Sequence, residues 1–133
     1  MKKQMKNNGA VFLIVIFAIA LMATITVGIL VMTTEELQLM QNQLYAAQAM
    51  CIAEAGLNDA FAQIRANPNW TAGFTNTPFN GGSYTVTVNS TLPKQIISTG
   101  TSSQGYMARM AADVTIGTSS PCKIRIDNLR VNE

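Results

Sequence analysis

The stretch Ala10–Met32, AVFLIVIFAIALMATITVGILVM, decides the architecture of this chain because it contains no charged residue. A helix rises about 1.5 Å per residue, so this run makes a helix roughly 34 Å long, which is enough to cross the bilayer's hydrocarbon core of about 30 Å. A secretory signal peptide has a shorter apolar core and a polar start to the mature chain. Cleavage after the A-x-A triplet Ala18–Ala20 would instead leave an apolar N-terminus. The sequence therefore predicts a retained membrane helix over residues 10–32.

Charges are distributed unevenly around this run. Lys2, Lys3 and Lys6 precede it, and Glu35 and Glu36 follow it closely. By the positive-inside rule, this asymmetry keeps the N-terminus in the cytoplasm and sends the C-terminal part of the chain outside. Of nine Lys and Arg residues only six remain beyond the leader, against seven Asp and Glu. No basic surface for nucleic acid is predicted.

The leader, residues 1–9, reads MKKQMKNNG and ends in a glycine directly before the apolar run. A short basic leader, a Gly and a retained apolar helix resemble the class III signal of type IV pilins and type II secretion pseudopilins. This resemblance implies that a prepilin peptidase cuts between Gly9 and Ala10 and that the new N-terminal residue, Ala10, is methylated. An uncleaved signal anchor, in which Gly9 is incidental, is the alternative.

One position departs from the pattern of major pilins. Their fifth residue after the cut is a Glu that is thought to pair with a neighbouring subunit's terminal amine, whereas this chain has Ile14. An ionised carboxylate in the bilayer costs about 3 kcal/mol unless it is paired. With Ile14 in its place this cost is absent, and so is the ion pair that would set the register of neighbouring subunits. PilX-type minor pilins and the GspK-type tip pseudopilin are similar to this chain in lacking the Glu. The resemblance therefore implies a minor or tip subunit.

Residues 33–66 continue the helix in composition. They contain no proline and are rich in Ala, Leu, Gln, Glu and Met, which favour helices. The sequence predicts one helix from Ala10 to about Ala66, roughly 85 Å long, half in lipid and half outside. Gly28 and Gly56 each weaken this helix by about 1 kcal/mol relative to Ala. Local unwinding is expected at Gly28, near the outer end of the membrane run.

Two carboxylates lie at the predicted membrane boundary, Glu35 and Glu36. They lie either on a solvated helix face or in ion pairs with Arg65 or Lys94 of a neighbouring subunit. The predicted assembly residues are Val11, Ile14, Gly28, Glu35 and Glu36.

Two apolar stripes follow the outer half of the helix at spacings of three and four residues. A helix that is apolar on two faces needs two partners. We expect the globular part of the same chain to cover the first stripe and neighbouring subunits to cover the second. The first stripe comprises Ala46, Met50, Ala53, Leu57, Ala60 and Ile64, and the second comprises Leu37, Met40, Leu44, Ala47, Cys51 and Ala55.

The segments Gln43–Ala49 and Ala53–Leu57 together resemble the Q-A-x-x-x-A-E-A-G pattern at this place in PilX-type minor pilins. Physically, Ala and Gly mark a helix surface that another backbone approaches closely. Gly82–Val86, Ile97–Thr101 and Ala108–Arg109 also resemble the C-terminal sheet of the same minor pilins. The resemblance spans nearly the whole chain.

Residues 67–82 are predicted to be a linker, because two prolines, Gly73 and an Asn-Gly-Gly run disfavour regular structure. Its aromatic residues either pack the linker onto the helix and sheet or form an exposed contact surface. These aromatic residues are Trp70, Phe74 and Phe79.

From residue 83 the hydrophobic period changes to two, which is typical of β-strands. Turn residues separate four such segments, so residues 83–133 are predicted to form an antiparallel meander. A sheet of three or four strands is stable only with one face covered, and the first stripe is the available cover. The predicted fold class is α+β, with a long N-terminal helix packed on a small C-terminal antiparallel sheet. Strands are expected at residues 84–88, 95–101 and 106–116 and from Lys123.

The two cysteines, Cys51 and Cys122, both fall outside the bilayer in the predicted topology. A bacterial envelope is oxidising, so a disulfide between them is predicted, with a stabilising effect of roughly 4 kcal/mol. In the alternative, Cys51 is a small buried apolar residue and Cys122 is a free thiol.

Patterns that carry chemistry are nearly absent. The chain has no His, no Gly-rich phosphate loop and no Cys spacing that fits zinc. We predict no catalytic residue, no metal site and no cofactor, and we do not expect an enzyme. Nucleic-acid binding is not expected either, because acidic residues interrupt the basic ones near the C-terminus.

The resemblance implies a structural subunit, either a minor pilin or a pseudopilin. Such a subunit enters the inner membrane, meets a prepilin peptidase, and polymerises with other pilin-like subunits through its helix. The product is a periplasmic or extracellular filament, a type IV pilus or a type II secretion pseudopilus. The alternative is a monomeric signal-anchored envelope protein whose small outer domain binds a ligand or partner. A processed N-terminus and filament formation distinguish the two.

Overall fold

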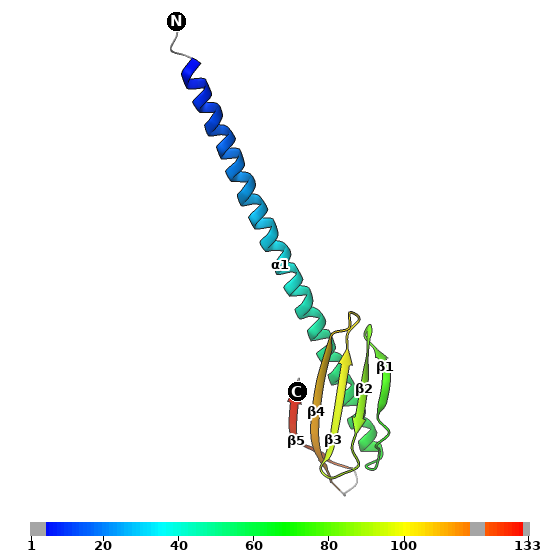
Figure 1. Ribbon diagram of the computed structural model, residues 1–133. Coiled ribbons are helices and arrows are strands. Elements are labelled where there is room, and N and C mark those ends of the chain that lie inside the picture. Colours follow the sequence, from blue (N-terminus) through cyan, green and yellow to red (C-terminus); the bar gives the residue numbers. More distant parts are fainter. Residues whose placement is uncertain (1–4, 118–121, 132–133) are drawn as a thin grey trace. The chain divides into compact units, whose positions relative to one another are not determined.

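The computed structural model of the protein describes residues 5–117 and 122–131. In this part of the chain a single helix, α1 (Met5–Ala66), precedes five strands (Figure 1). The predicted α+β class is confirmed. The strands are β1 (Phe74–Phe79), β2 (Gly82–Val88), β3 (Lys94–Thr101), β4 (Met107–Ile116) and β5 (Ile124–Val131).

The chain forms two compact units, residues 1–41 and residues 42–133. The described part of the first unit is helical throughout, and the second unit contains the rest of α1 and the sheet. The first four residues of the predicted leader lie outside the described residues.

All neighbouring strands in the sheet are antiparallel, in the order β1-β2-β3-β4-β5. This is the meander expected when short turns join strands of alternating polarity. The four strands predicted from residue 83 onward are confirmed, each starting within two residues of its expected position.

The predicted linker over residues 67–82 is wrong for Phe74–Phe79, which form β1. A proline cannot donate to a neighbouring strand, but Pro78 is tolerated because β1 is an edge strand of the sheet. The pairing of β1 with β2 shifts between Phe74 and Thr77, where Asn76 has a φ of +47°. Such an irregularity at a sheet edge is a β-bulge, which composition alone does not reveal.

The aromatic residues of this region divide between the two alternatives. Trp70 and Phe74 are half-buried and pack against the core, with their ring centroids 5.3 Å apart. Phe79 is 45 % exposed, and its ring lies near that of Tyr84 with centroids 6.4 Å apart.

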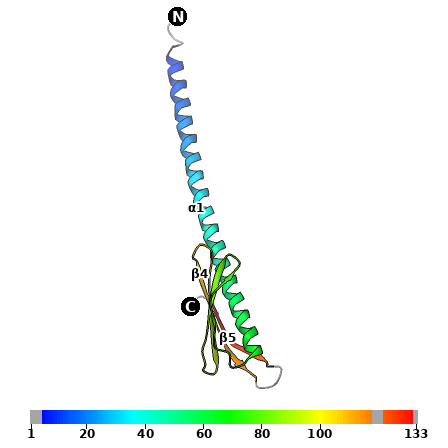
Figure 2. The ribbon, with the colours of Figure 1, turned by 90° about the vertical axis from the view of Figure 1, so that its right-hand side faces the viewer.

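The hydrophobic core lies between the second half of α1 and one face of the sheet. Figure 2 shows this half of the helix running along that face. Alternate residues of β2, β3 and β4 point toward the helix, as the period of two requires. The core consists of Ile52, Leu57, Ala60, Ile64, Tyr84, Val86, Ile96, Ala112 and Val114.

The face of α1 that the sheet covers is turned slightly from the prediction. Ala53, Leu57, Ala60 and Ile64 are buried as expected, but Ala46 is exposed and Met50 is 40 % exposed. Their place is taken by three other residues, Ala49, Ile52 and Gly56.

Close approach of two backbones explains this rotation. A Cβ added at Gly100 of β3 would lie 2.3 Å from the carbonyl oxygen of Ala49, and one added at Gly56 would lie 2.6 Å from Oγ of Ser98. Small residues on both sides therefore let helix and strand meet. The prediction of a closely approaching backbone at the Ala- and Gly-rich segment is confirmed, and that backbone is the chain's own β3.

A buried lysine fixes the loop that follows α1. Nζ of Lys94, at the start of β3, donates hydrogen bonds to the carbonyl oxygens of Pro68 (2.6 Å) and Trp70 (3.0 Å). Burial lowers the pKa of the Lys94 ammonium, because leaving water disfavours its charged form. Lys94 is only 5 % exposed. It is therefore not available for the ion pair with a neighbouring subunit's Glu35 or Glu36.

Candidate assembly surface

The apolar run of residues 10–32 lies within α1 with its large side chains exposed. Val11 is 59 % exposed and Ile14 is 67 % exposed. By length and composition, α1 from Gly9 onward is able to cross a membrane. So large an exposed apolar surface is unfavourable in water. This segment is therefore compatible with a membrane-spanning helix or a signal anchor.

Threonine hydroxyl groups in and beside this run donate hydrogen bonds to backbone carbonyl oxygens of the same helix. Oγ1 of Thr24 donates to the carbonyl oxygen of Leu21 at 2.8 Å, and Oγ1 of Thr26 donates to that of Met22 at 2.8 Å. Thr33 makes the same kind of bond one turn back. A hydroxyl without a partner would be costly in hydrocarbon. These threonines are thus compatible with a lipid environment.

The predicted cleavage site lies at the start of α1. Gly9 and Ala10 are helical and exposed, and apart from the adjacent helix backbone no atom of the described residues lies within 4 Å of a Cβ added at Gly9. Packing within the chain therefore gives no reason for a glycine at this position. Cleavage and methylation remain predictions.

The predicted unwinding at Gly28 is not found. The helix continues through this residue, and beyond the adjacent helix backbone a Cβ added there would meet no described atom within 4 Å. The cost of one glycine, about 1 kcal/mol, is small against a long run of good helix formers. Glu35 and Glu36 follow on the same helix and are exposed.

The second predicted stripe, called the outer stripe below, is left uncovered by the sheet. Leu37 is 54 % exposed, and Met40 and Leu44 are each 66 % exposed. Ala47 and Cys51 are also exposed, and Ala55 is half-buried. The sheet thus covers four of the six residues of the first stripe and leaves most of the outer stripe exposed.

A shallow, largely apolar groove of about 520 Å³ runs over part of the outer stripe. Leu44, Ala47 and Cys51 line it from the helix. Asn80, in the turn between β1 and β2, accepts a hydrogen bond through its carbonyl oxygen from Nε2 of Gln48 at 2.9 Å. Gln48 and Asn80 also line the groove. This contact holds one wall of the groove in place.

An aromatic contact that sequence patterns did not indicate lies beside this groove. The rings of Tyr45 and Tyr106 stack with centroids 5.9 Å apart, and the Tyr106 hydroxyl donates to Oδ1 of Asn42 at 2.5 Å. Both tyrosines fall outside the predicted stripes, and their pairing depends on how the β3–β4 turn meets the helix. No sequence signal short of the tertiary fold would have identified it.

The predicted disulfide is wrong, because Cys51 and Cys122 are both free thiols. Cys51 lines the groove near Asn80, at the end of the sheet where β1 turns into β2. Cys122 lies near Lys94, where β3 begins. The eight residues of β3 span roughly 26 Å between these two ends. A disulfide requires Cα atoms within about 7 Å, so one chain cannot form this bond in this fold.

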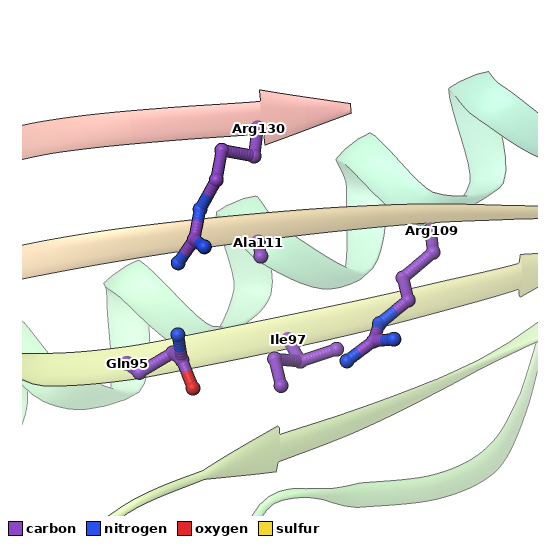
Figure 3. A pocket seen from close by; sticks show the side chains of 5 residues that line it. All are labelled: Gln95, Ile97, Arg109, Ala111 and Arg130. Atoms are coloured by element: carbon purple, nitrogen blue, oxygen red, sulfur yellow. The ribbon is translucent and has the colours of Figure 1, made fainter. Parts of the chain in front are cut away.

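A small depression lies on the sheet face away from α1 (Figure 3). Its volume is about 60 Å³, and it is lined by Gln95, Ile97, Arg109, Ala111 and Arg130. Asp113 forms an ion pair with Arg130, whose Nη2 lies 3.1 Å from Oδ2 of Asp113. Nε2 of Gln95 donates a hydrogen bond to the same carboxylate at 3.2 Å. Asp113 therefore pairs part of this polar surface.

Comparisons with family models, with curated proteins and with solved structures returned no match. The architecture of a long apolar N-terminal helix on a small antiparallel sheet is pilin-like.

Proposed function

We propose that this protein is a structural subunit, a minor pilin or pseudopilin, that polymerises through α1 into a pilus-like or secretion filament. The exposed apolar surface of α1 carries this proposal. Large apolar side chains are exposed both in the membrane run and in the outer stripe, while the sheet covers only the opposite face of the second half of the helix. A filament of such subunits would bury both regions among neighbouring helices.

The leader supports the same proposal. A basic leader that ends in Gly9, followed at once by an uncharged helix, resembles the site at which a prepilin peptidase cuts and methylates. In this proposal the subunit waits in the inner membrane and leaves it during assembly into a periplasmic or extracellular filament. Ile14, in place of the usual Glu, favours a minor or tip position.

The rival function is that of a signal-anchored monomer whose outer domain binds a partner. The aromatic contact of Tyr45 with Tyr106 and the exposed Met107 beside it, 74 % exposed, form the surface such a domain would use. This rival does not account for the uncovered outer stripe.

Two substitutions at one position test the proposal. Ile14→Asp places an unpaired charge in lipid or in a helix bundle, at a cost of about 3 kcal/mol, and should block incorporation into filaments. Ile14→Glu places its carboxylate where a neighbouring subunit's terminal amine can pair with it, and should be tolerated. The measurement is the amount of each variant in sheared filaments relative to the membrane fraction. Equal loss of the two variants from both fractions would contradict the proposal.

A further inference from the structure

Five residues of the outer stripe have the spacing of a surface that pairs with another helix. Leu37, Met40, Leu44, Ala47 and Cys51 follow one another at alternating steps of three and four. This average period of 3.5 residues keeps one line of side chains facing a second helix over successive turns. All five are exposed on α1.

The residues around these five also suit a helix as the partner. Ala49, Ala53 and Gly56 lie on the opposite face of α1, where the sheet covers them. The flanking positions Gln41 and Gln43 carry no charge, so two copies would not repel each other there. The pattern ends after Cys51, because its next positions are Glu54 and Asn58.

We propose that two membrane-anchored copies of this chain pair through the outer stripe, just outside the bilayer, with their α1 helices parallel and in register. Both copies enter the membrane by the same end, which makes the helices parallel. Register follows from the same insertion, because the uncharged run of residues 10–32 sets both helices at the same depth in the bilayer. In this pair the two copies of Cys51 face each other across the contact.

The inference rests on the membrane insertion of the proposed function and does not require a filament. Subunits of a helical filament are offset along its axis, so identical residues of neighbours do not meet there. The in-register pair is therefore a state of the membrane-bound protein that differs from the assembled one.

Disulfide trapping of the full-length protein in native membranes tests the pairing. Variants carry one cysteine each in a Cys122→Ser background: native Cys51, Cys51→Ser with Ala47→Cys, and Cys51→Ser with Ala46→Cys. Copper phenanthroline and oxygen accept the two electrons and two protons that leave when two thiols form one disulfide. We expect dimers on non-reducing gels from Cys51 and Ala47→Cys, at least about tenfold faster than from Ala46→Cys, which is exposed but off the stripe.

A second substitution guards against collisional cross-linking. Leu44→Glu, with Cys51 kept, places two like charges in the contact and should slow Cys51 dimer formation at least about tenfold. The inference is overturned if Cys51 reacts no faster than Ala46→Cys, or if Leu44→Glu leaves its rate unchanged. Rapid Cys51 dimers in a protein that keeps its leader and forms no filaments would uphold the pair and refute the proposed function.

Discussion

At the scale of single residues, buried polar groups tie the sheet to its surroundings. The Tyr84 hydroxyl on β2 donates a hydrogen bond to the carboxylate of Asp59 on α1. Burial, and then this hydrogen bond, raise the pKa of Tyr84 to about 12. Lys94 makes a comparable anchor to the loop after α1. Neither partner was predictable from sequence, because Asp59 and Pro68 are far from these residues along the chain.

The shifted pKa of Tyr84 predicts a loss of stability in alkali. Because the folded protein holds this proton more tightly than the unfolded chain, the stabilisation is complete below pH 10 and is lost as the pH rises toward about 12. The loss amounts to about 2–3 kcal/mol. Tyr84→Phe should lower stability at pH 8 but flatten the fall between pH 10 and pH 12. Urea unfolding at several pH values in detergent measures this, and parallel curves for the two proteins would contradict it.

At the scale of helices and strands, hydrophobic periodicity predicted the elements that depend on local sequence alone. The helix and the four strands after residue 83 follow directly from periods near 3.6 and 2. The sequence pattern did not predict β1, because Pro78 and Asn76 are typical of loops. The edge position of this strand in the sheet is what makes them acceptable. The predicted burial of Ala46 and Met50 was wrong. The close approach of the α1 backbone to Gly100 of β3, and not hydrophobicity, decides which residues of the helix meet the sheet.

The close approach predicts that Gly100 cannot accept a side chain. Gly100→Ala would bring its Cβ to 2.3 Å from the Ala49 carbonyl oxygen, where rigid backbone cannot yield without moving the helix. We expect a loss of about 3 kcal/mol in the free energy of unfolding. Gly117→Ala is the matched control, since its Cβ would lie 3.4 Å from the nearest described atom. Thermal unfolding of the three proteins measures the difference, and equal melting temperatures for the two variants would refute the packing account.

At the scale of the whole molecule, the chain combines an uncovered apolar helix surface with a small globular unit. The sequence could predict the exposed outer stripe, because two apolar faces on one helix exceed what a small sheet can cover. The disulfide prediction failed at this scale. The direction in which β3 runs along the helix separates Cys51 from Cys122, and neither composition nor spacing reports that direction.

The N-terminal residue of the protein purified from its native membrane tests the central claim most directly. If the chain is a pilin-like subunit, intact mass and N-terminal peptide spectra should show a chain that begins at Ala10, heavier by the mass of one methyl group on its terminal amine. The same spectra of a strain without prepilin peptidase should show the leader retained. A native protein that begins at Met1, with an unmodified Gly9–Ala10 bond, would contradict the account.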